Sequence, residues 1–295
     1  MQAPFGKVVT AMITPFTADG EVDYDKACEL ALHLAENGSD ALVVAGTTGE
    51  SPNLSEAEKI RLFTAISEAV RGKAKVIAGT GSNATEASVA LTKKAEKCGV
   101  DAVMLVVPYY NKPSQEGLYR HFARIAQATE LPVMLYNVPG RTAVNMVAET
   151  TLRLAGEIKN IVAIKEASGN LEQIAKICAL APEGFYVYSG DDSMTLPIVA
   201  VGGCGVVSVA SHIAGNAIKE MLAAYFDGRV EKAAALHQRL LPLFKVLFIT
   251  SNPAPVKCAL KLQGFDAGPL RLPLVGLTDG EEAAVRKVMQ DLGYL

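Results

Sequence analysis

The sequence has no tryptophan and few residues of the kinds that bind metal ions or form disulfide frameworks. Five cysteines and four histidines are scattered over 295 residues. No two cysteines form a Cys-x-x-Cys pair, and the histidines share no spacing with cysteines or carboxylates. This pattern is not that of a zinc site, and it predicts reduced cysteines in a cytoplasmic protein. We therefore expect no metal ion and no disulfide.

An excess of one charge and long apolar runs are absent as well. The formal net charge is −3 without any run of like charges, so nothing indicates binding to nucleic acid or to an anionic membrane surface. No apolar run is long enough to span a bilayer, and residues 1–9 lack the basic patch and apolar core typical of a signal peptide. Hydrophobic residues make up 50% of the chain, which is enough for a large buried core.

Short apolar runs alternate with amphipathic segments over residues 1–228. We predict eight strands, each followed by a helical segment, at residues 8–13, 41–45, 75–78, 102–107, 132–136, 161–165, 185–188 and 205–209. Eight such units are typical of a closed parallel barrel, and an open doubly wound sheet is the alternative. The first strand leads into Thr14-Pro15-Phe16 and not into a glycine-rich phosphate turn, so we favour an α/β fold, the (β/α)8 TIM barrel.

Residues 229–295 carry helical patterns and no predicted strand. We predict a helix over residues 230–250, a second that ends near Leu262 and a third that begins at Thr278. Thr278 and Glu281 have the spacing of a capping box, as do Ser55 and Glu58 earlier in the chain. We expect this C-terminal helical region to be structural, and the barrel of residues 1–228 to be the catalytic domain.

The sixth predicted strand leads directly into Lys165. Its four preceding residues, 161–164, are apolar, and such a short run is typical of a strand buried on both faces. We expect Lys165 to lie half out of the core, where lost hydration lowers the pKa of its amine. A neutral amine can attack a ketone and form a Schiff base. The alternative is a lysine that extends to solvent or pairs with an acidic neighbour.

Other polar residues follow the second and fifth strands. In the segment Gly46-Thr47-Thr48-Gly49-Glu50, hydroxyl and N–H groups could bind a small carboxylate, although an ordinary turn has the same composition. Tyr136 could transfer protons beside the lysine, and Arg141 could bind a carboxylate with two hydrogen bonds. A core tyrosine and a solvated arginine are the alternatives.

Two further loops have weaker signals. The paired residues Tyr109 and Tyr110 after the fourth strand are more often packing or interface residues than acids. After the seventh strand, Gly190 precedes Asp191 and Asp192. We interpret these aspartates as helix caps.

Taken together, these motifs resemble the pyruvate-dependent class I aldolase superfamily typified by dihydrodipicolinate synthase and N-acetylneuraminate lyase. The matching segments are Gly46-Thr47-Thr48-Gly49-Glu50, the segment from Tyr136 to Thr142, and Ile164-Lys165-Glu166-Ala167-Ser168. The resemblance extends from about Val9 to the C-terminal helices. It implies a TIM barrel that needs no metal or organic cofactor and that usually assembles as a homotetramer, a dimer of tight dimers.

The resemblance also implies roles for the catalytic residues. Lys165 would form the Schiff base with pyruvate. Thr47, Tyr136 and Tyr110 would form a proton relay, with Tyr110 reaching across from a neighbouring subunit. The sequence therefore predicts an active site that a single chain does not complete.

The same resemblance implies how the substrates bind. The hydroxyl and N–H of Thr48 would hold the pyruvate carboxylate, and Arg141 would receive the carboxylate of L-aspartate-4-semialdehyde. Gly190 and Val207 would line the pocket through their backbone. An arginine after Tyr-Asn-x-Pro is typical of the synthases, and the lyases lack it. We therefore expect condensation of pyruvate with the semialdehyde, the first committed step of lysine and diaminopimelate biosynthesis.

Two alternatives stay open. One is an aldolase or lyase of the same superfamily that acts on another 2-oxo acid, such as a sugar acid or hydroxy-oxoglutarate. The other is a barrel that binds a keto acid without catalysis. Arg141 argues against the first, and the full set of reactive residues argues against the second.

Family members that are inhibited by lysine carry histidines and a glutamate in a pocket at the dimer interface. The corresponding positions here are Glu56, Lys59 and Ala87, while the rest of the pocket would consist of Ser51, Asn83 and Tyr109. Lys59 would place a cation where the lysine ligand should bind, and like charges repel. We therefore expect feedback by lysine to be weak or absent.

Overall fold

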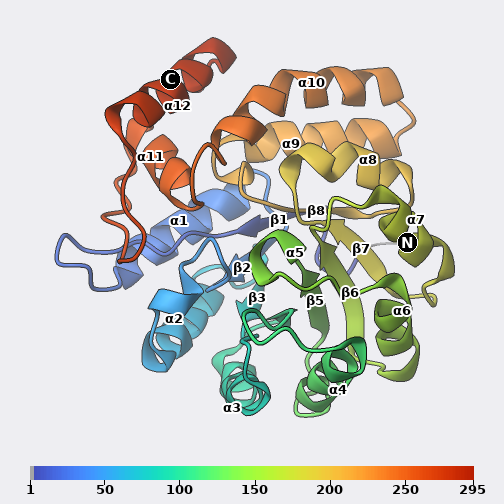
Figure 1. Cartoon of the computed structure of the whole chain (residues 1–295). Coiled ribbons are helices and arrows are strands. Elements are labelled where there is room, and N and C mark those ends of the chain that lie inside the picture. Colours follow the sequence, from blue (N-terminus) through green and yellow to red (C-terminus); the bar gives the residue numbers. More distant parts are fainter. Residues whose placement is uncertain (1–2) are drawn as a thin grey trace.

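A computed structural model describes residues 3–295 and shows a closed barrel of eight parallel strands (Figure 1). Each strand pairs with the next along the chain, and the last strand pairs with the first. The strands are β1 Val8–Ala11, β2 Ala41–Val44, β3 Lys75–Gly79, β4 Ala102–Val106, β5 Val133–Asn137, β6 Ile161–Glu166, β7 Tyr186–Ser189 and β8 Gly205–Ser208. The predicted (β/α)8 barrel is confirmed, and the open sheet is excluded.

Helices surround the barrel on its outside (Figure 1). Those of the barrel are α1 Tyr24–Glu36, α2 Glu56–Ala69, α3 Thr85–Ala95, α4 Gln115–Ala126, α5 Pro139–Thr142, α6 Ala148–Glu157, α7 Leu171–Leu180, α8 Thr195–Ala200 and α9 Ser211–Phe226. The predicted capping box at Ser55 is confirmed, since its hydroxyl accepts from the N–H of Glu58 and the Glu58 carboxylate accepts from the N–H of Ser55.

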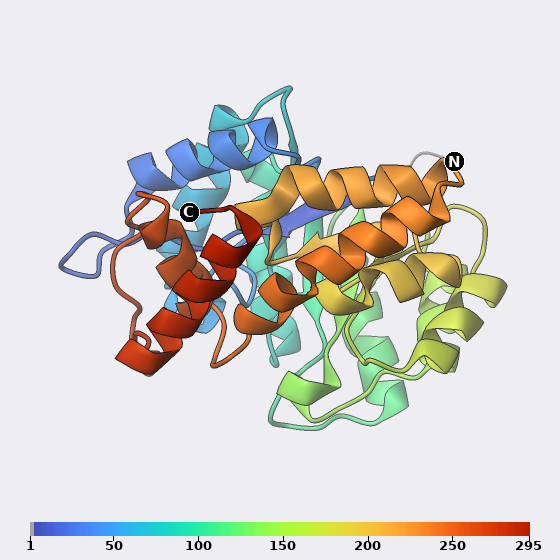
Figure 2. The ribbon, with the colours of Figure 1, turned by 90° about the horizontal axis from the view of Figure 1, so that it is seen from above.

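Three more helices follow the barrel: α10 Val230–Val246, α11 Ala254–Leu262 and α12 Asp279–Leu292. Helix α10 packs along α9, and α12 packs on both α10 and α11 (Figure 2). The predicted capping box at Thr278 is confirmed. Helix α10 ends four residues earlier than predicted, because the β-branched Ile249 and Thr250 disfavour helix and Pro253 follows them.

Two apolar clusters make up the core. The larger one lies between the strands and the helices. The smaller one fills the barrel and consists of inward-facing residues from β1 to β8, among them Val9, Ile77, Met134, Tyr136, Tyr188 and Val207. Successive residues of a strand face opposite sides, so the short apolar runs supply both clusters at once. None of the helices within residues 3–295 is long and apolar enough to cross a membrane.

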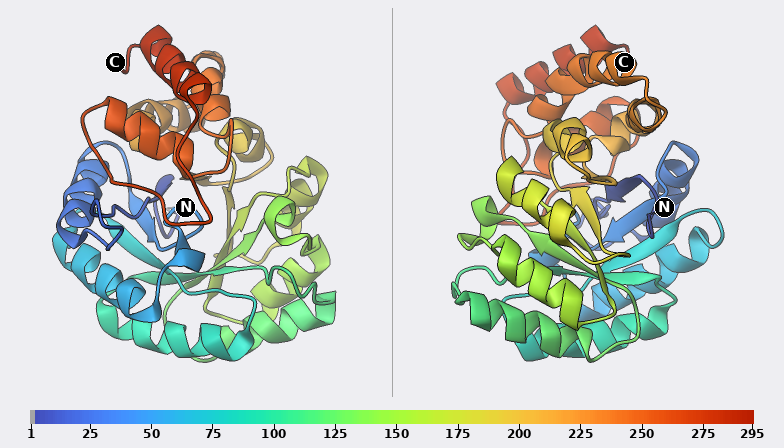
Figure 3. Two further views of the ribbon diagram at one scale, coloured as in Figure 1. Left: turned by 60° about the vertical axis from the view of Figure 1, so that its left-hand side comes forward. Right: turned by 90° about the vertical axis from the view of Figure 1, so that its right-hand side faces the viewer.

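The C-terminal helices gather on one side of the barrel (Figure 3). Lys257 of α11 is buried there, and its Nζ lies 2.8 Å from the carboxylate of Glu50, which is also buried. The same ammonium donates to the carbonyl of Pro269 at 2.9 Å. Glu50 follows β2, so this ion pair joins the loop after β2 to the C-terminal region.

Lys257→Met should lower the free energy of unfolding by about 3–5 kcal/mol, because it leaves the Glu50 carboxylate buried without a cation. Urea denaturation at a fixed protein concentration measures this change. Lys261→Met in the same helix removes an exposed lysine and should change the free energy by less than about 0.5 kcal/mol. Equal free energies of unfolding in the two variants would show that the Lys257–Glu50 ion pair does not contribute to stability.

Candidate active site

Strands β5 and β6 place Lys165 beside Tyr136. The two residues pair in register, and the Lys165 Nζ lies 4.3 Å from the centroid of the Tyr136 ring. Lys165 is only 5% exposed, so the expectation that it lies half out of the core is wrong. Gly190 explains part of this burial, since a Cβ atom there would lie 3.1 Å from the Lys165 Cγ and 2.7 Å from the Ala167 Cβ.

The next pair along the same two strands holds their ends together. Asn137 pairs in register with Glu166, and its Nδ2 donates to both carboxylate oxygens at 3.1 and 3.2 Å. The N–H of Ser168 and the amide of Gln173 also donate to Glu166. This buried network lies on the outer face of the strands, so it fixes Tyr136 and Lys165 without occupying the barrel interior.

Burial shifts the protonation of Lys165. It lowers the pKa of the amine to about 8, while the carboxylate of Asp192 opposes this shift and the cation of Arg141 adds to it. A substantial fraction of the side chain is therefore neutral at mildly basic pH. A neutral amine at this position can act as a nucleophile.

Asp192 has a role that the sequence analysis missed. Asp191 caps the following turn by accepting from the N–H of Ser193 at 2.8 Å, as predicted. The buried carboxylate of Asp192 instead accepts from the Ser208 hydroxyl at 2.5 Å, and from the N–H groups of Val209 and Ala210 at 3.0 Å each. Asp192 lies in the first turn of the short helix 192–194, as the predicted dipole effect requires, but its side chain does not cap that helix, because its partners follow β8.

Tyr136 also forms part of a cavity of about 260 Å³ at the carboxyl ends of the strands. Thr47 and Arg141 line the same cavity. Burial raises the pKa of Tyr136, while the Arg141 cation and a hydrogen bond with Thr47 oppose this shift. The cavity thus brings together a phenol, a hydroxyl and a guanidinium group next to the Lys165 amine.

The loop after β2 lies in the same region. Thr48 is buried, and its Oγ1 accepts a hydrogen bond of 2.9 Å from the Nδ2 of Asn252. The hydroxyl of Thr14 donates to the carbonyl of Gly49 at 2.7 Å. Asn252 belongs to the C-terminal region and was not among the predicted site residues, because no local pattern links it to residue 48.

Two predicted residues differ sharply in their surroundings. Val207 on β8 is buried in the cluster that fills the barrel. Tyr110 is 90% exposed, has a φ of 74°, and does not line the cavity. A single chain therefore does not bring Tyr110 to Tyr136 and Thr47.

The expected lysine pocket is only partly assembled in the chain. Ser51, Lys59 and Tyr109 line the same cavity as Thr47, Tyr136 and Arg141. Glu56 is exposed and pairs with Lys94, and the carbonyl of Asn83 accepts from Asn111 at 2.8 Å. Burial lowers the pKa of Lys59, and the Glu56 carboxylate opposes this shift.

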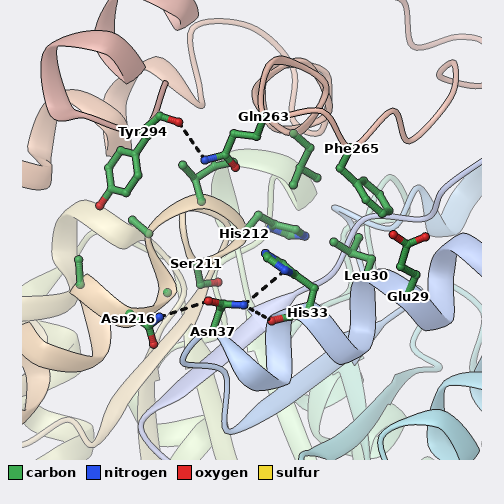
Figure 4. A pocket seen from close by; sticks show the side chains of 15 residues that line it. Glu29, Leu30, His33, Asn37, Ser211, His212, Asn216, Gln263, Phe265 and Tyr294 are labelled. Carbon is green, nitrogen blue, oxygen red and sulfur yellow. Dashed lines mark hydrogen bonds between the residues drawn. The ribbon is translucent and has the colours of Figure 1, made fainter.

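A larger cavity of about 550 Å³ lies outside the barrel between α1, α9 and α11 (Figure 4). His212 in its wall donates from Nδ1 to the Val209 carbonyl and accepts at Nε2 from the N–H of Ile13. Burial lowers the pKa of His212 to about 4, which agrees with a neutral, structural ring. None of the predicted site residues lines this cavity, and it contains no lysine. Of the predicted catalytic and substrate-binding residues, Thr47, Tyr136 and Arg141 line the smaller cavity instead, whereas Lys165 and Thr48 are not among its lining residues.

The described part of the chain, residues 3–295, contains no group of three His, Cys, Asp or Glu side chains arranged to hold a metal ion. The cavity is lined by the Tyr136 phenol, the Thr47 hydroxyl and the Arg141 guanidinium group, and the Lys165 amine lies against the Tyr136 ring. Their chemistry is that of a nucleophilic amine with acid–base and anion-binding groups beside it.

The rate of adduct formation between Lys165 and a small 2-oxo acid should rise with pH to a plateau, with its midpoint near pH 8. Cyanoborohydride trapping and mass spectrometry measure this rate. Arg141→Gln removes a cation that lowers the pKa of the amine, so the midpoint should move to higher pH. Arg120→Gln, an exposed change on α4, should leave it in place. A midpoint in Arg141→Gln that is unchanged or lower would contradict the electrostatic role of this arginine.

Comparison with known proteins agrees with this geometry. The model of the dihydrodipicolinate synthetase family matches residues 4–292. The 4-hydroxy-tetrahydrodipicolinate synthase of Bacillus subtilis (strain 168) is 61% identical over 98% of this chain and 99% of its own length.

Solved structures show the same fold. The dihydrodipicolinate synthase of Cyanidioschyzon merolae, solved with lysine bound, is 52% identical, with a TM-score of 0.98 and full coverage of both chains. A structure described as the first monomeric dihydrodipicolinate synthase variant is 46% identical, with a TM-score of 0.96 and coverage of 99% of this chain and 98% of the other. The resemblance predicted from the sequence is confirmed, and the chain belongs to the dihydrodipicolinate synthetase family.

Proposed function

We propose that this chain catalyses the 4-hydroxy-tetrahydrodipicolinate synthase reaction, a lyase-type condensation of pyruvate with L-aspartate-4-semialdehyde through a Schiff base on Lys165. The observation that carries the proposal is the buried Lys165 amine, with a pKa lowered to about 8, beside Tyr136. The name of the Bacillus subtilis relative supports the same reaction.

The chemistry begins with attack of the neutral Lys165 amine on the keto carbon of pyruvate. Loss of water gives the imine, and loss of a proton from the methyl group gives an enamine. The enamine carbon attacks the aldehyde carbon of the semialdehyde and forms the new carbon–carbon bond. The amino group of the semialdehyde then adds to the imine carbon, closes the ring and releases Lys165 as the amine.

Thr47, Tyr136 and Tyr110 form the proposed proton relay. Tyr136 and Thr47 line the same cavity, which supports the first half of the relay. Tyr110 is exposed on the loop after β4, which fits a residue that completes the site of a neighbouring subunit. We therefore propose a homotetramer built as a dimer of dimers. One family relative is described as a monomeric variant, so assembly is not uniform among these proteins.

Four residues form the proposed substrate-binding surface. Thr48 binds the pyruvate carboxylate through its hydroxyl and N–H groups, and Arg141 binds the carboxylate of the semialdehyde. Gly190 and Val207 shape the wall. The close approach of Gly190 to Lys165 supports its part, since any side chain there would crowd the reacting amine.

The alternatives are a related aldolase or lyase for another 2-oxo acid and a barrel that binds keto acids without catalysis. Arg141 at the cavity and the synthase names of the relatives favour the condensation.

Two further expectations stay predictions. One is a location in the cytoplasm, and the other is a division between a catalytic barrel of residues 1–228 and a helical region of residues 229–295. Residues 1 and 2 lie outside the described part.

Borohydride reduction in the presence of pyruvate should leave a reduced pyruvate adduct on Lys165. Peptide mass spectrometry locates the adduct. Lys165→Ala should abolish both adduct and turnover, because it removes the nucleophile. Lys176→Ala, an exposed lysine on α7, is the control and should keep both.

The absence of an adduct from folded wild-type protein would remove both enzyme hypotheses and leave the binding barrel. If the adduct forms, turnover with a panel of aldehydes separates the condensation from the related reactions of the superfamily.

Lysine at submillimolar concentration should leave at least half of the turnover intact, because Lys59 places a partly buried cation in the wall of the cavity. A steady-state assay with increasing lysine measures this. Stronger inhibition would show that lysine binds despite Lys59. The double variant Lys59→His/Ala87→Glu, which restores two of the three family residues, should become more sensitive than the wild type.

A further inference from the structure

A residue of the C-terminal region reaches the proposed substrate-binding loop. Asn252 lies between α10 and α11, 204 residues along the chain from Thr48. Both side chains are buried, with exposed fractions of 5% and 3%. The Nδ2 of Asn252 donates to the Thr48 Oγ1 at 2.9 Å. Among residues 3–295, the Thr48 side chain makes this one hydrogen bond to the protein.

The direction of this bond decides what the Thr48 hydroxyl can do. A threonine hydroxyl has one proton to donate and an oxygen that accepts. Since the oxygen accepts from an amide that can only donate at Nδ2, the hydroxyl proton has to find its acceptor elsewhere. No protein atom in the described residues accepts it. A buried donor without a protein acceptor is suited to an anionic ligand such as a carboxylate.

The other end of the Asn252 amide is unpaired as well. Its Oδ1 is buried and has no hydrogen-bond partner among residues 3–295. Buried polar atoms are nearly always paired, so an unpaired one in a folded chain calls for an explanation. The hydrogen bond to Thr48 is the one that the Asn252 amide group makes within the described residues.

Further contacts from the C-terminal region hold the same loop. Glu50, two residues after Thr48, pairs with Lys257 of α11 at 2.8 Å. The N–H of Arg271 donates to the other carboxylate oxygen of Glu50 at 3.1 Å. Asn252 and Lys257 lie on either side of the start of α11, so the contact to Thr48 is set by a segment that is itself fixed.

We propose that Asn252 is a positioning residue for pyruvate binding. It holds the Thr48 oxygen as an acceptor and thereby directs the hydroxyl proton to the substrate carboxylate. Asn252 acts through Thr48 and does not itself touch the reacting atoms. The proposal rests on the proposed function, in which Thr48 binds that carboxylate.

The test measures how adduct formation on Lys165 depends on pyruvate concentration during reduction. Asn252→Ala should raise the half-saturating pyruvate concentration by about tenfold, the effect of one lost hydrogen bond to a charged group. The rate at saturating pyruvate should change less than threefold, since the Lys165 amine is untouched. Asn252→Asp replaces the donor by an anion of the same shape, so it should raise the half-saturating concentration further.

Asn160→Ala is the matched control. The Asn160 amide donates to the carbonyls of Ala126, Thr129 and Leu131 at the opposite end of the barrel. This variant should lower the melting temperature and leave the half-saturating concentration unchanged. A shift of equal size in Asn160→Ala would mean that Asn252 has a structural role only.

A double-mutant cycle separates action through Thr48 from other effects. In a Thr48→Val background, Asn252→Ala should have no further effect on half-saturation. Independent, multiplicative effects would overturn the proposal. If Asn252→Ala does not fold, Asn252→Asp is used in its place in the cycle. Loss of the adduct in wild-type protein would instead reject the proposed function, so the two failures are distinguishable.

Discussion

The proposed chemistry depends on the removal of the Lys165 amine from water, which is unfavourable for a charged group. Burial disfavours the ammonium form and lowers the pKa of this residue to about 8. The Asp192 carboxylate raises the pKa of Lys165, and the Arg141 cation lowers it. Asp192 is held by Ser208 and by two N–H groups after β8, so its charge occupies a fixed place. The protonation of Lys165 is thus a balance between burial and two charges that lie after different strands, Arg141 after β5 and Asp192 after β7.

This balance needs a rigid setting, and the alternation of side chains along a strand provides it. Tyr136 and Lys165 are one register pair of β5 and β6, and Asn137 and Glu166 are the next. The first pair faces the reacting side, while the second pair hydrogen-bonds behind it. Because adjacent residues face opposite sides, the strands present the chemistry on one side and fasten themselves together on the other.

The sequence was sufficient for features that are local in the chain. Eight apolar runs with helical segments between them predict the barrel, and the run before Lys165 predicts a buried strand. The capping boxes at Ser55 and Thr278 are likewise three-residue patterns. Contacts between distant segments were not accessible in this way. Asp192 resembled any helix cap until its partners beyond β8 were known, and Asn252 carries no signal that relates it to Thr48. The degree of burial of Lys165 also depended on a distant residue, Gly190.

These distant contacts change how the chain should be divided. By topology, the barrel ends before α10, and the last three helices are an addition to its side. The contacts give a different division. The loop that carries Thr48 and Glu50 is bound by Asn252, Lys257 and Arg271, all in the C-terminal region. A barrel without that region would leave the Glu50 carboxylate buried without its cation and the Thr48 hydroxyl without its donor. The loop that carries Thr48 and Glu50 is therefore held by side chains and backbone of the C-terminal region as well as by the barrel.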